Sequence, residues 1–316
     1  MRRWPERSLS DEIHLPVLAD KVVEQLSSCP DGFFIDATVG AGGHLKAVSK
    51  AHGKRFRYFG FDLDNSVLQR TENHLTQMGI EVELINSNFS NVTDFLQGRG
   101  ISTISAILYD LGIGSFQIDD PKRGFSYLQD GPLSMSFDGS SASTAADIIE
   151  SRSEKELVDL FRTYGEEPKA KILARTIKNN PERITTTGQL ADILRSVVGD
   201  RRFIKTASRI FQALRIKVND ELAHIEKGLE SILPLMATGG KAMVISYHSL
   251  EDGLVKRIFK KFSGKCVCPP KMPECRCGTV KLVRPVFTKP LIPDAKEIAV
   301  NRRARSAKMR IVEKIG

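Results

Sequence analysis

The residues best suited to chemistry lie in the segment 33–44, where an apolar run ends in Asp36 and a glycine-rich turn follows. The turn contains Gly40, Gly42, Gly43 and His44, and a helix-like run occupies 45–51. Glycine has no Cβ, so the backbone can turn tightly and approach a ligand closely. Such a loop after a first parallel strand usually binds a nucleotide-like cofactor. A plain tight turn is the alternative interpretation.

The spacing in this loop differs from the dinucleotide-binding pattern G-x-G-x-x-G. The chain has Asp36-x-x-x-Gly40-x-Gly42-Gly43. An acid inside the loop would repel a pyrophosphate but would attract a cation. The loop therefore favours a cofactor such as S-adenosylmethionine, which carries an ammonium and a sulfonium group.

Other apolar runs also end in residues that suit a cofactor site. Asp62 lies near the end of the predicted strand 58–64, Asp110 ends the strand 106–110, and Phe89 lies just beyond the strand 81–85. In an open parallel sheet these strand ends lie on one edge, where ligands bind. The second-strand acid would accept hydrogen bonds from ribose hydroxyls, and Phe89 would stack on adenine. A single aspartate after a strand is often only a helix cap, but the whole set favours a cofactor site.

The strand–helix alternation stops near Gly112 and returns after Gly240. The intervening sequence predicts helices over 145–149, 153–164, 166–179, 187–198 and 208–233. The second of these helices begins with the capping signature Ser153-x-x-Glu156. A run of helices between two α/β segments predicts an α/β fold with an inserted helical domain.

Charge and hydropathy indicate the kind of partner and the cellular location to expect. The 316 residues carry a net charge of +9, which favours a polyanionic partner such as nucleic acid over the alternative of a merely basic enzyme. The sequence has no run of 18 apolar residues, so no membrane-spanning helix is predicted. The N-terminus does not have the pattern of a secretory signal. We expect a cytoplasmic protein.

Four of the five cysteines cluster at Cys266, Cys268, Cys275 and Cys277. Four thiolates suit tetrahedral zinc, although C-x-C is tighter than the usual C-x2–4-C spacing. Free thiols or a redox-labile pair are the alternatives to a metal site.

A series of longer motifs carries a family resemblance. In chain order they are His14-x-Pro16-Val17-Leu18, Asp110-Leu111-Gly112, Gln117-x-Asp119, Arg123-Gly124-Phe125-Ser126, Asp130-Gly131-Pro132-Leu133, Tyr164-Gly165-Glu166-Glu167, Thr185-x-Thr187, Phe211-Gln212-Ala213-Leu214-Arg215-Ile216-x-Val218-Asn219-x-Glu221, His248-Ser249-Leu250-Glu251-Asp252 and Asn301-x-Arg303-x-Arg305-Ser306-Ala307. The chain from about residue 12 to its end closely resembles the bacterial 16S rRNA cytosine-N4 methyltransferase family.

The resemblance implies a class I S-adenosylmethionine-dependent methyltransferase (Rossmann-like) sheet formed by residues 1–113 and 214–316. It implies an inserted helical, RNA-recognition domain at 114–213. The implied target is a cytosine in the decoding region of 16S rRNA within the small ribosomal subunit, and the enzyme would be a monomer or a homodimer. The family's cofactor contacts fall on Gly42, Gly43, His44, Asp62, Phe89, Asp110 and Gln117, beside Asp36 and Gly40 of the loop.

Methyl transfer to the weakly nucleophilic cytosine N4 needs acceptors that hold the amino hydrogens and stabilise the developing positive charge. Asp110 is the first candidate, followed by His248, Glu251 and Asp252, for which a strand-end turn with a helix-start acid is the alternative. The residues predicted to contact RNA are Arg123, Phe125, Arg215, Asn219, Arg303 and Arg305, the last two through phosphates.

Two loops depart from the family pattern. Positions 113–116 read Ile-Gly-Ser-Phe where Val-Ser-Ser-Pro is usual, and Ser134 and Ser136 replace an acid and an arginine. These changes keep two other hypotheses open. One is a methyltransferase of another RNA or protein target, and the other is a weakly catalytic, RNA-binding ribosome-assembly factor.

Overall fold

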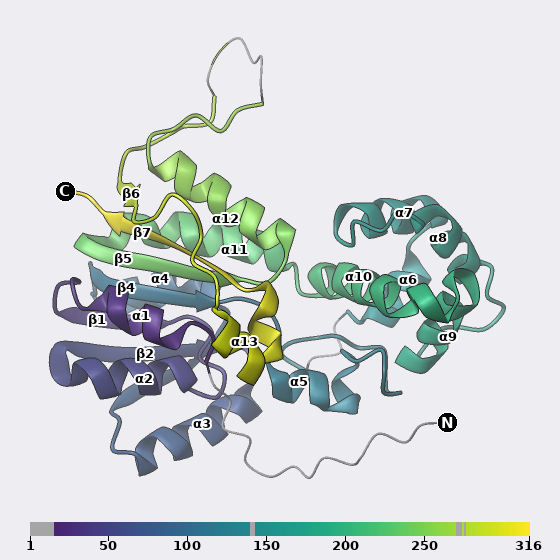
Figure 1. The fold of residues 1–316 in the computed structure, drawn as a ribbon, viewed down its shortest axis with the longest axis horizontal. Helices are drawn as coiled ribbons and strands as arrows, with labels where there is room; N and C mark the ends of the chain where they lie inside the picture. The colour runs from purple at the N-terminus through teal and green to yellow at the C-terminus, as the bar shows by residue number, and fades with distance from the viewer. Residues whose placement is uncertain (1–15, 140–142, 270–273, 275) are drawn as a thin grey trace.

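A seven-stranded mixed sheet forms the centre of the computed structural model, which describes residues 16–139, 143–269, 274 and 276–316 (Figure 1). The strands are β1 (Gly32–Asp36), β2 (Phe56–Asp62), β3 (Val82–Asn86), β4 (Ile104–Asp110), β5 (Met236–Ser246), β6 (Val283–Pro285) and β7 (Lys308–Lys314). Their order is β3-β2-β1-β4-β5-β7-β6. The first five pair in parallel, and β7 runs antiparallel to β5 and β6. The predicted Rossmann-like α/β fold is confirmed.

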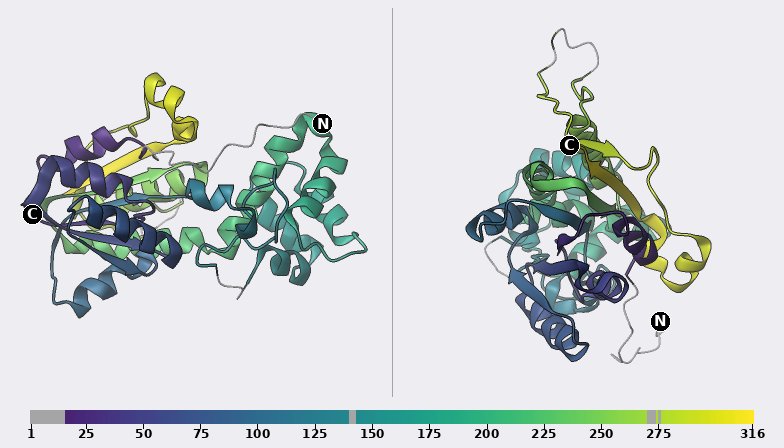
Figure 2. Two further views of the ribbon diagram at one scale, coloured as in Figure 1. Left: turned by 90° about the horizontal axis from the view of Figure 1, so that it is seen from below. Right: turned by 90° about the vertical axis from the view of Figure 1, so that its left-hand side faces the viewer.

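Helices cover both faces of this sheet (Figures 1 and 2). The helices α1 (Ala19–Leu26), α2 (Gly43–His52), α3 (Asn65–Gln77) and α13 (Ala295–Val300) lie on one side, and α4 (Val92–Gly98), α11 (Glu221–Ile232) and α12 (Ser249–Phe262) lie on the other. Neighbouring residues of β4 point to opposite faces of the sheet. Leu108 therefore packs in the core beneath α1, α2 and α3, and Ile107 packs in the core beneath α4, α11 and α12. None of the helices in the described part of the chain is long and apolar enough to span a membrane.

A second group of helices packs beside the sheet around a core of its own (Figure 1). It comprises α6 (Ala145–Ser151), α7 (Glu154–Thr163), α8 (Ala170–Lys178), α9 (Thr187–Val198) and α10 (Asp200–Val218), and the short α5 (Ser115–Asp119) precedes it. The predicted cap is present, because the Ser153 hydroxyl accepts the Glu156 amide hydrogen. The separate core runs from Phe125 to Leu214, and α10 continues past the predicted domain boundary at 213 to Val218.

The single helix predicted over 208–233 is wrong, because the structure has two helices there. The first, α10, already begins at Asp200 and ends at Val218, and α11 begins at Glu221. The Asn219 side chain donates to the carbonyl of Arg215 (2.9 Å), and Asp220 adopts a left-handed φ of +43°. Such side-chain bonds to the backbone compete with helix continuation. The break separates the helical unit from the helix that covers the sheet.

The loop between α5 and α6 passes close to itself at two glycines. A Cβ at Gly131 would lie 2.0 Å from the carbonyl oxygen of Pro121, and a Cβ at Gly124 would lie 2.1 Å from that of Pro132. Both contacts are with backbone atoms, so a side chain can be accommodated only if the two segments separate.

We therefore expect Gly131→Ala to lower the free energy of unfolding by about 1–3 kcal/mol, the usual cost of overpacking. Gly253→Ala is the control, because this glycine lies inside α12 and its Cβ would meet nothing within 4 Å. That change should be neutral or stabilise by up to about 1 kcal/mol. Urea unfolding of both variants measures the difference, and equal stability of Gly131→Ala and the natural chain would contradict the expectation.

Candidate active site

The three acids predicted at strand ends lie on one edge of the sheet. Asp36, Asp62 and Asp110 are the last residues of β1, β2 and β4, and β1 pairs with both of the other strands. The strand order reverses between β1 and β4, and open α/β sheets bind ligands at such a point. This edge therefore has the position of a cofactor site.

The glycine-rich loop is fixed against the same edge. Gly40 and Gly42 have φ values of +48° and +77°, and a Cβ at Gly42 would lie 3.0 Å from the Thr71 side chain. The Gly40 amide donates to Oδ2 of Asp62 (3.0 Å), and the Thr71 hydroxyl donates to the Gly40 carbonyl (2.6 Å). The loop leads directly into α2, which begins at Gly43.

Burial disfavours the charged form of two of the three acids. It raises the pKa of Asp36 to about 7 and that of Asp62 to about 6. The Asp62 carboxylate accepts two backbone amides, from Gly40 and Asp64. Asp36 accepts only the Thr38 amide (3.2 Å) on Oδ1, and its Oδ2 has no hydrogen-bond partner among the described residues. A cation placed beside Asp36 would favour its ionised form, whereas an anion would be repelled.

Two side chains converge on the carboxylate of Asp110. The Tyr247 hydroxyl donates to Oδ1 (2.7 Å), and Nε2 of His44 lies 3.4 Å from Oδ2. Burial acts to lower the pKa of His44, but the contact with Asp110 and the charge of Asp36 outweigh it, so the net pKa lies above its usual value. Burial, together with the charge of Asp110, raises the pKa of Tyr247 well above its usual value, so its hydroxyl keeps its proton and donates it.

Neither Tyr247 nor Thr38 is predicted as a site residue from the sequence. The Asp110 amide donates to Oγ1 of Thr38 (2.7 Å), which ties β4 to the turn after β1. Tyr247 follows β5 directly, and β5 lies beside β4 with Ile245 opposite Asp110. In the sequence Tyr247 is only a tyrosine at the end of a predicted strand. Its position beside Asp110 follows only from the pairing of β5 with β4.

The buried groups of this edge fit S-adenosylmethionine. Nδ1 of His44 and Oδ2 of Asp36 are buried without a hydrogen-bond partner in the described chain, so polar groups of a ligand can engage them. A Cβ at Gly43 would lie 3.2 Å from Pro16, and one at Gly112 would lie 3.4 Å from the Tyr247 ring. The two glycines thus let the backbone pass close to Pro16 and Tyr247, and the carboxylates suit the ammonium and sulfonium charges.

Phe89 and Gln117 also follow strands that end on this edge. The Phe89 ring is partly buried and packs edge-on against Tyr109, with 5.6 Å between ring centroids. Gln117 is buried in α5, where its Oε1 accepts the Gly114 amide hydrogen (3.1 Å). The structure therefore shows both side chains held by protein contacts near the predicted cofactor edge.

His248 and Glu251, predicted as catalytic, belong to a buried charged cluster with Glu221 and Arg215. Nε2 of His248 lies 3.0 Å from Oε1 of Glu251, and Oε2 of Glu251 accepts the Tyr247 amide hydrogen (2.8 Å). Arg215 binds Glu221 through two hydrogen bonds of 2.8 and 3.0 Å. Burial raises the pKa of Glu221; burial acts the same way on Glu251, but His248 and Arg215 lower its net pKa. Although three possible metal ligands meet here, the guanidinium already supplies the compensating positive charge.

Asp252 is held apart from this cluster. Its carboxylate accepts two hydrogen bonds from Arg310 (2.6 and 3.0 Å), and Nζ of Lys308 lies 3.7 Å away. Both basic residues belong to β7, so Asp252 anchors the first turn of α12 to the sheet. His248 caps the same helix, because its Nδ1 accepts the Glu251 amide hydrogen (3.4 Å).

Two of the predicted RNA-binding residues hold the loop around Phe137. The Arg123 guanidinium pairs with Asp64 (2.8 Å) and donates to the Phe137 carbonyl (2.5 Å). The Asn219 side chain accepts the Phe137 amide hydrogen (2.9 Å) and donates to the Met135 carbonyl (2.8 Å). Arg123 therefore connects this loop to the start of α3, at which Asp64 is the N-cap.

The remaining predicted RNA-binding residues differ in exposure. Phe125 is buried in the helical core and stacks on Phe137 at 5.6 Å, and Arg215 lies in the charged cluster. Arg303 and Arg305 are exposed, and Arg303 lies 3.3 Å from Asp119. Of this set, Arg303 and Arg305 are available at the surface.

The structure also brings Cys266, Cys268 and Cys277 together, with their sulfur atoms all within 4.8 Å of one another. Cys275, the fourth predicted zinc ligand, lies outside the described residues, as does His14 of the family motifs.

Comparisons with known proteins give one consistent relationship. A family model described as the MraW methylase family matches residues 11–315. The Ribosomal RNA small subunit methyltransferase H of Carboxydothermus hydrogenoformans is 40% identical over 306 residues, which cover 96% of this chain and 98% of the relative. The enzyme of the same name from Clostridioides difficile is 38% identical over 96% of this chain and 99% of its own length. A solved rRNA methylase from Streptococcus thermophilus covers 96% of this chain and 99% of its own at 11% identity and a TM-score of 0.43, too weak a likeness to carry an argument. The chain belongs to the MraW methylase family.

Proposed function

We propose that this protein transfers a methyl group from S-adenosylmethionine to N4 of a cytosine in the decoding region of 16S rRNA, within the small ribosomal subunit. The observation that carries the proposal is the carboxylate of Asp110 at the end of β4, held by Tyr247 and faced by His44. The full-length relatives named as small-subunit rRNA methyltransferases and the net charge of +9 support an RNA target.

S-adenosylmethionine supplies the electrophilic methyl group when it is bound. Asp36, Asp62 and the loop from Gly40 to Gly43 would hold it, with the acids facing its positive charges and hydroxyls. Phe89 would contact the adenine of the cofactor, and His44 and Gln117 would complete the pocket. The Thr38 hydroxyl, which accepts the Asp110 amide hydrogen, keeps β1 and β4 in register beside it.

Asp110 would accept a hydrogen bond from the cytosine amino group. This contact would orient the nitrogen lone pair toward the methyl group and stabilise the positive charge that develops on nitrogen. Because the Tyr247 hydroxyl already donates to Oδ1, the Asp110 carboxylate has a fixed orientation. His248 and Glu251 shape the turn that carries Tyr247, and Asp252 anchors that turn to β7.

The target base must be unstacked or single-stranded to reach this edge. Arg303 and Arg305 would contact phosphates, which adds salt-dependent affinity with little sequence choice. Arg123, Arg215 and Asn219 would act on RNA binding indirectly, by fixing the loop around Phe137 and the end of α10. A monomer or homodimer in the cytoplasm remains our prediction.

The first test follows label from S-adenosylmethionine into small subunits that lack the modification, with the modified nucleoside mapped by mass spectrometry. We expect N4-methylcytidine at one decoding-region cytosine. Label at another RNA or protein site would support the alternative target instead. Cofactor binding without transfer to any RNA would contradict the enzyme assignment and favour an assembly factor.

Asp110→Asn should lower the turnover rate about 100-fold or more, because it removes a preorganised charge from the transition state. Tyr247→Phe should lower the rate about 10- to 100-fold, because a hydrogen bond to a charged group contributes about 1.5–3 kcal/mol. Tyr58→Phe is the matched control, since its hydroxyl donates to the Gly53 carbonyl, at the other end of β2 from Asp62. Single-turnover kinetics on small subunits measure all three rates, and equal rates for Tyr247→Phe and Tyr58→Phe would exclude the proposed role of Tyr247.

Affinity for S-adenosylmethionine should rise with pH through the range of about 6 to 7. The ligand cation favours ionised carboxylates, and without ligand Asp36 and Asp62 have pKa values of about 7 and 6, so protons must leave on binding below those values. Each pH unit below the pKa of Asp36 costs up to about tenfold in affinity.

Calorimetry between pH 5.5 and 8 checks this dependence. Asp36→Asn should bind more weakly at pH 8 and lose most of the slope between pH 6 and 7. S-adenosylhomocysteine, which lacks the sulfonium charge, is the control ligand and should show a shallower slope. An affinity for S-adenosylmethionine that does not change over this range would refute the electrostatic argument.

A further inference from the structure

The loop that follows α12 is closed at its base by backbone hydrogen bonds. We call residues 263–282 the cysteine loop. The amide of Gly264 donates to the carbonyl of Val280 (3.1 Å), and the amide of Leu282 donates to that of Phe262 (2.8 Å). The described part of the cysteine loop extends beyond the end of α12, away from the sheet (Figure 1). Backbone pairing therefore fixes the base of this loop.

Three cysteines of this loop converge in space although eleven positions separate the first from the last. The sulfur atoms of Cys266, Cys268 and Cys277 all lie within 4.8 Å of one another, and Sγ of Cys277 is 3.8 Å from Sγ of Cys266. A disulfide needs about 2.05 Å, so this pair is not bonded in that way. A tetrahedral zinc site with Zn–S bonds of about 2.3 Å separates its sulfur atoms by about 3.8 Å. The distance between Cys266 and Cys277 therefore matches that of two zinc ligands, and Cys268 lies within reach of the same ion.

Backbone amides are directed at two of the three sulfur atoms. The Cys268 amide approaches Sγ of Cys266 (3.4 Å), and the Val267 amide approaches Sγ of Cys277 (3.5 Å). N–H donors stabilise a thiolate over a thiol, and metal sites depend on such outer contacts to hold and orient their ligands. The tight C-x-C spacing does not prevent shared ligation, because the sulfur atoms of Cys266 and Cys268 lie within 4.8 Å of each other.

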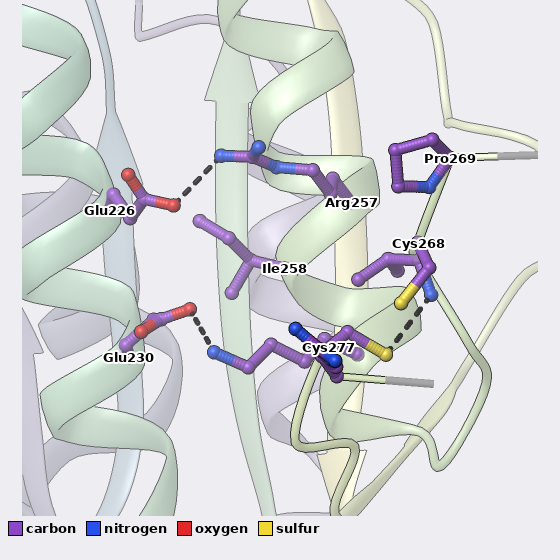
Figure 3. Close-up of a pocket in the computed structure, with 10 residues that line it drawn as sticks. Glu226, Glu230, Arg257, Ile258, Cys268, Pro269 and Cys277 are labelled. Carbon is purple, nitrogen blue, oxygen red and sulfur yellow. Dashed lines mark hydrogen bonds and ion pairs between the residues drawn. The ribbon is translucent and has the colours of Figure 1, made fainter. Parts of the chain in front are cut away.

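Two of these cysteines also face a charged surface formed by α11 and α12. Figure 3 shows Cys268 and Cys277 lining a pocket opposite side chains of α11 and α12. There Arg257 pairs with Glu226 (2.7 Å) and Lys261 pairs with Glu230 (2.7 Å). A metal bound by these cysteines would hold the cysteine loop against the charged surface of α11 and α12. This surface lies far from the acids at the ends of β1, β2 and β4.

We propose that Cys266, Cys268 and Cys277 bind one zinc ion that orders the cysteine loop. Soft thiolate ligands in a compact set select zinc over the harder divalent cations. The bound thiols release their protons to solvent as the zinc–sulfur bonds form, so no oxidant or reductant is required. The site takes no part in methyl transfer, and the proposal is independent of the proposed target.

The test measures metal content in the full-length protein purified under reducing conditions. We expect one equivalent of zinc per chain by elemental analysis, and thiolate-to-metal charge-transfer absorption when cobalt replaces zinc. Cys266→Ser with Cys277→Ser should lose the metal. Cys29→Ser is the matched control, because this buried cysteine lies in the core beside α1, and it should keep one equivalent.

Limited proteolysis gives a second readout, since chelation should expose the cysteine loop to cleavage while affinity for S-adenosylmethionine stays unchanged. Absence of zinc, iron in its place, or zinc retained in the double variant would each overturn the proposal. Loss of cofactor affinity on chelation would overturn the assigned structural role.

Discussion

The candidate site depends on three carboxyl groups that the fold brings together at the carboxyl-terminal edge of the parallel strands. Asp36, Asp62 and Asp110 end three adjacent strands, and burial raises the pKa of the first two. Backbone amides from Gly40 and Asp64 stabilise Asp62, and Tyr247 with His44 stabilises Asp110. Asp36 is the acid left with an oxygen unsatisfied within the described chain. The fold thus gathers acids at an edge where a cationic cofactor would compensate their charge, and Gly40 and Gly42 supply the left-handed backbone of the adjoining loop.

Charged contacts also couple this edge to the helical unit. Arg123 joins the loop around Phe137 to Asp64, whose backbone amide binds Asp62. On the other side, Arg215 of α10 belongs to the cluster in which Glu251 binds the Tyr247 amide. Truncating one partner of such a buried pair costs about 3–5 kcal/mol, because the other charge is left uncompensated. The position of the helical unit and the orientation of Asp110 are therefore linked through short chains of contacts.

The sequence predicted those parts of the site that local pattern determines. An apolar run ending in an acid, followed by glycines, marks a strand end, and three such ends meet once the sheet is parallel. Arg123, Arg215 and Asn219, which stand in the motifs of the family resemblance, are predicted to contact RNA. Their partners, Asp64, Glu221 and Phe137, depend on the tertiary fold, and for Arg123 and Asn219 they are distant in the chain. The break at Asn219 escaped prediction because an apolar helical periodicity continues on both sides of it.

The altered loop at 134–137 shows why lost family residues need not remove activity. The loop is held by its backbone: Arg123 and Asn219 bind the carbonyls and amide of Met135 and Phe137, and the Ser134 amide donates to Pro132. None of these contacts uses the side chains of Ser134 or Ser136, and Ser136 instead hydrogen-bonds Asp138. Replacing an acid and an arginine by two serines therefore changes the charge that the loop presents and leaves the contacts that place it. An effect on choice of target follows more directly from that change than a loss of the catalytic arrangement around Asp110.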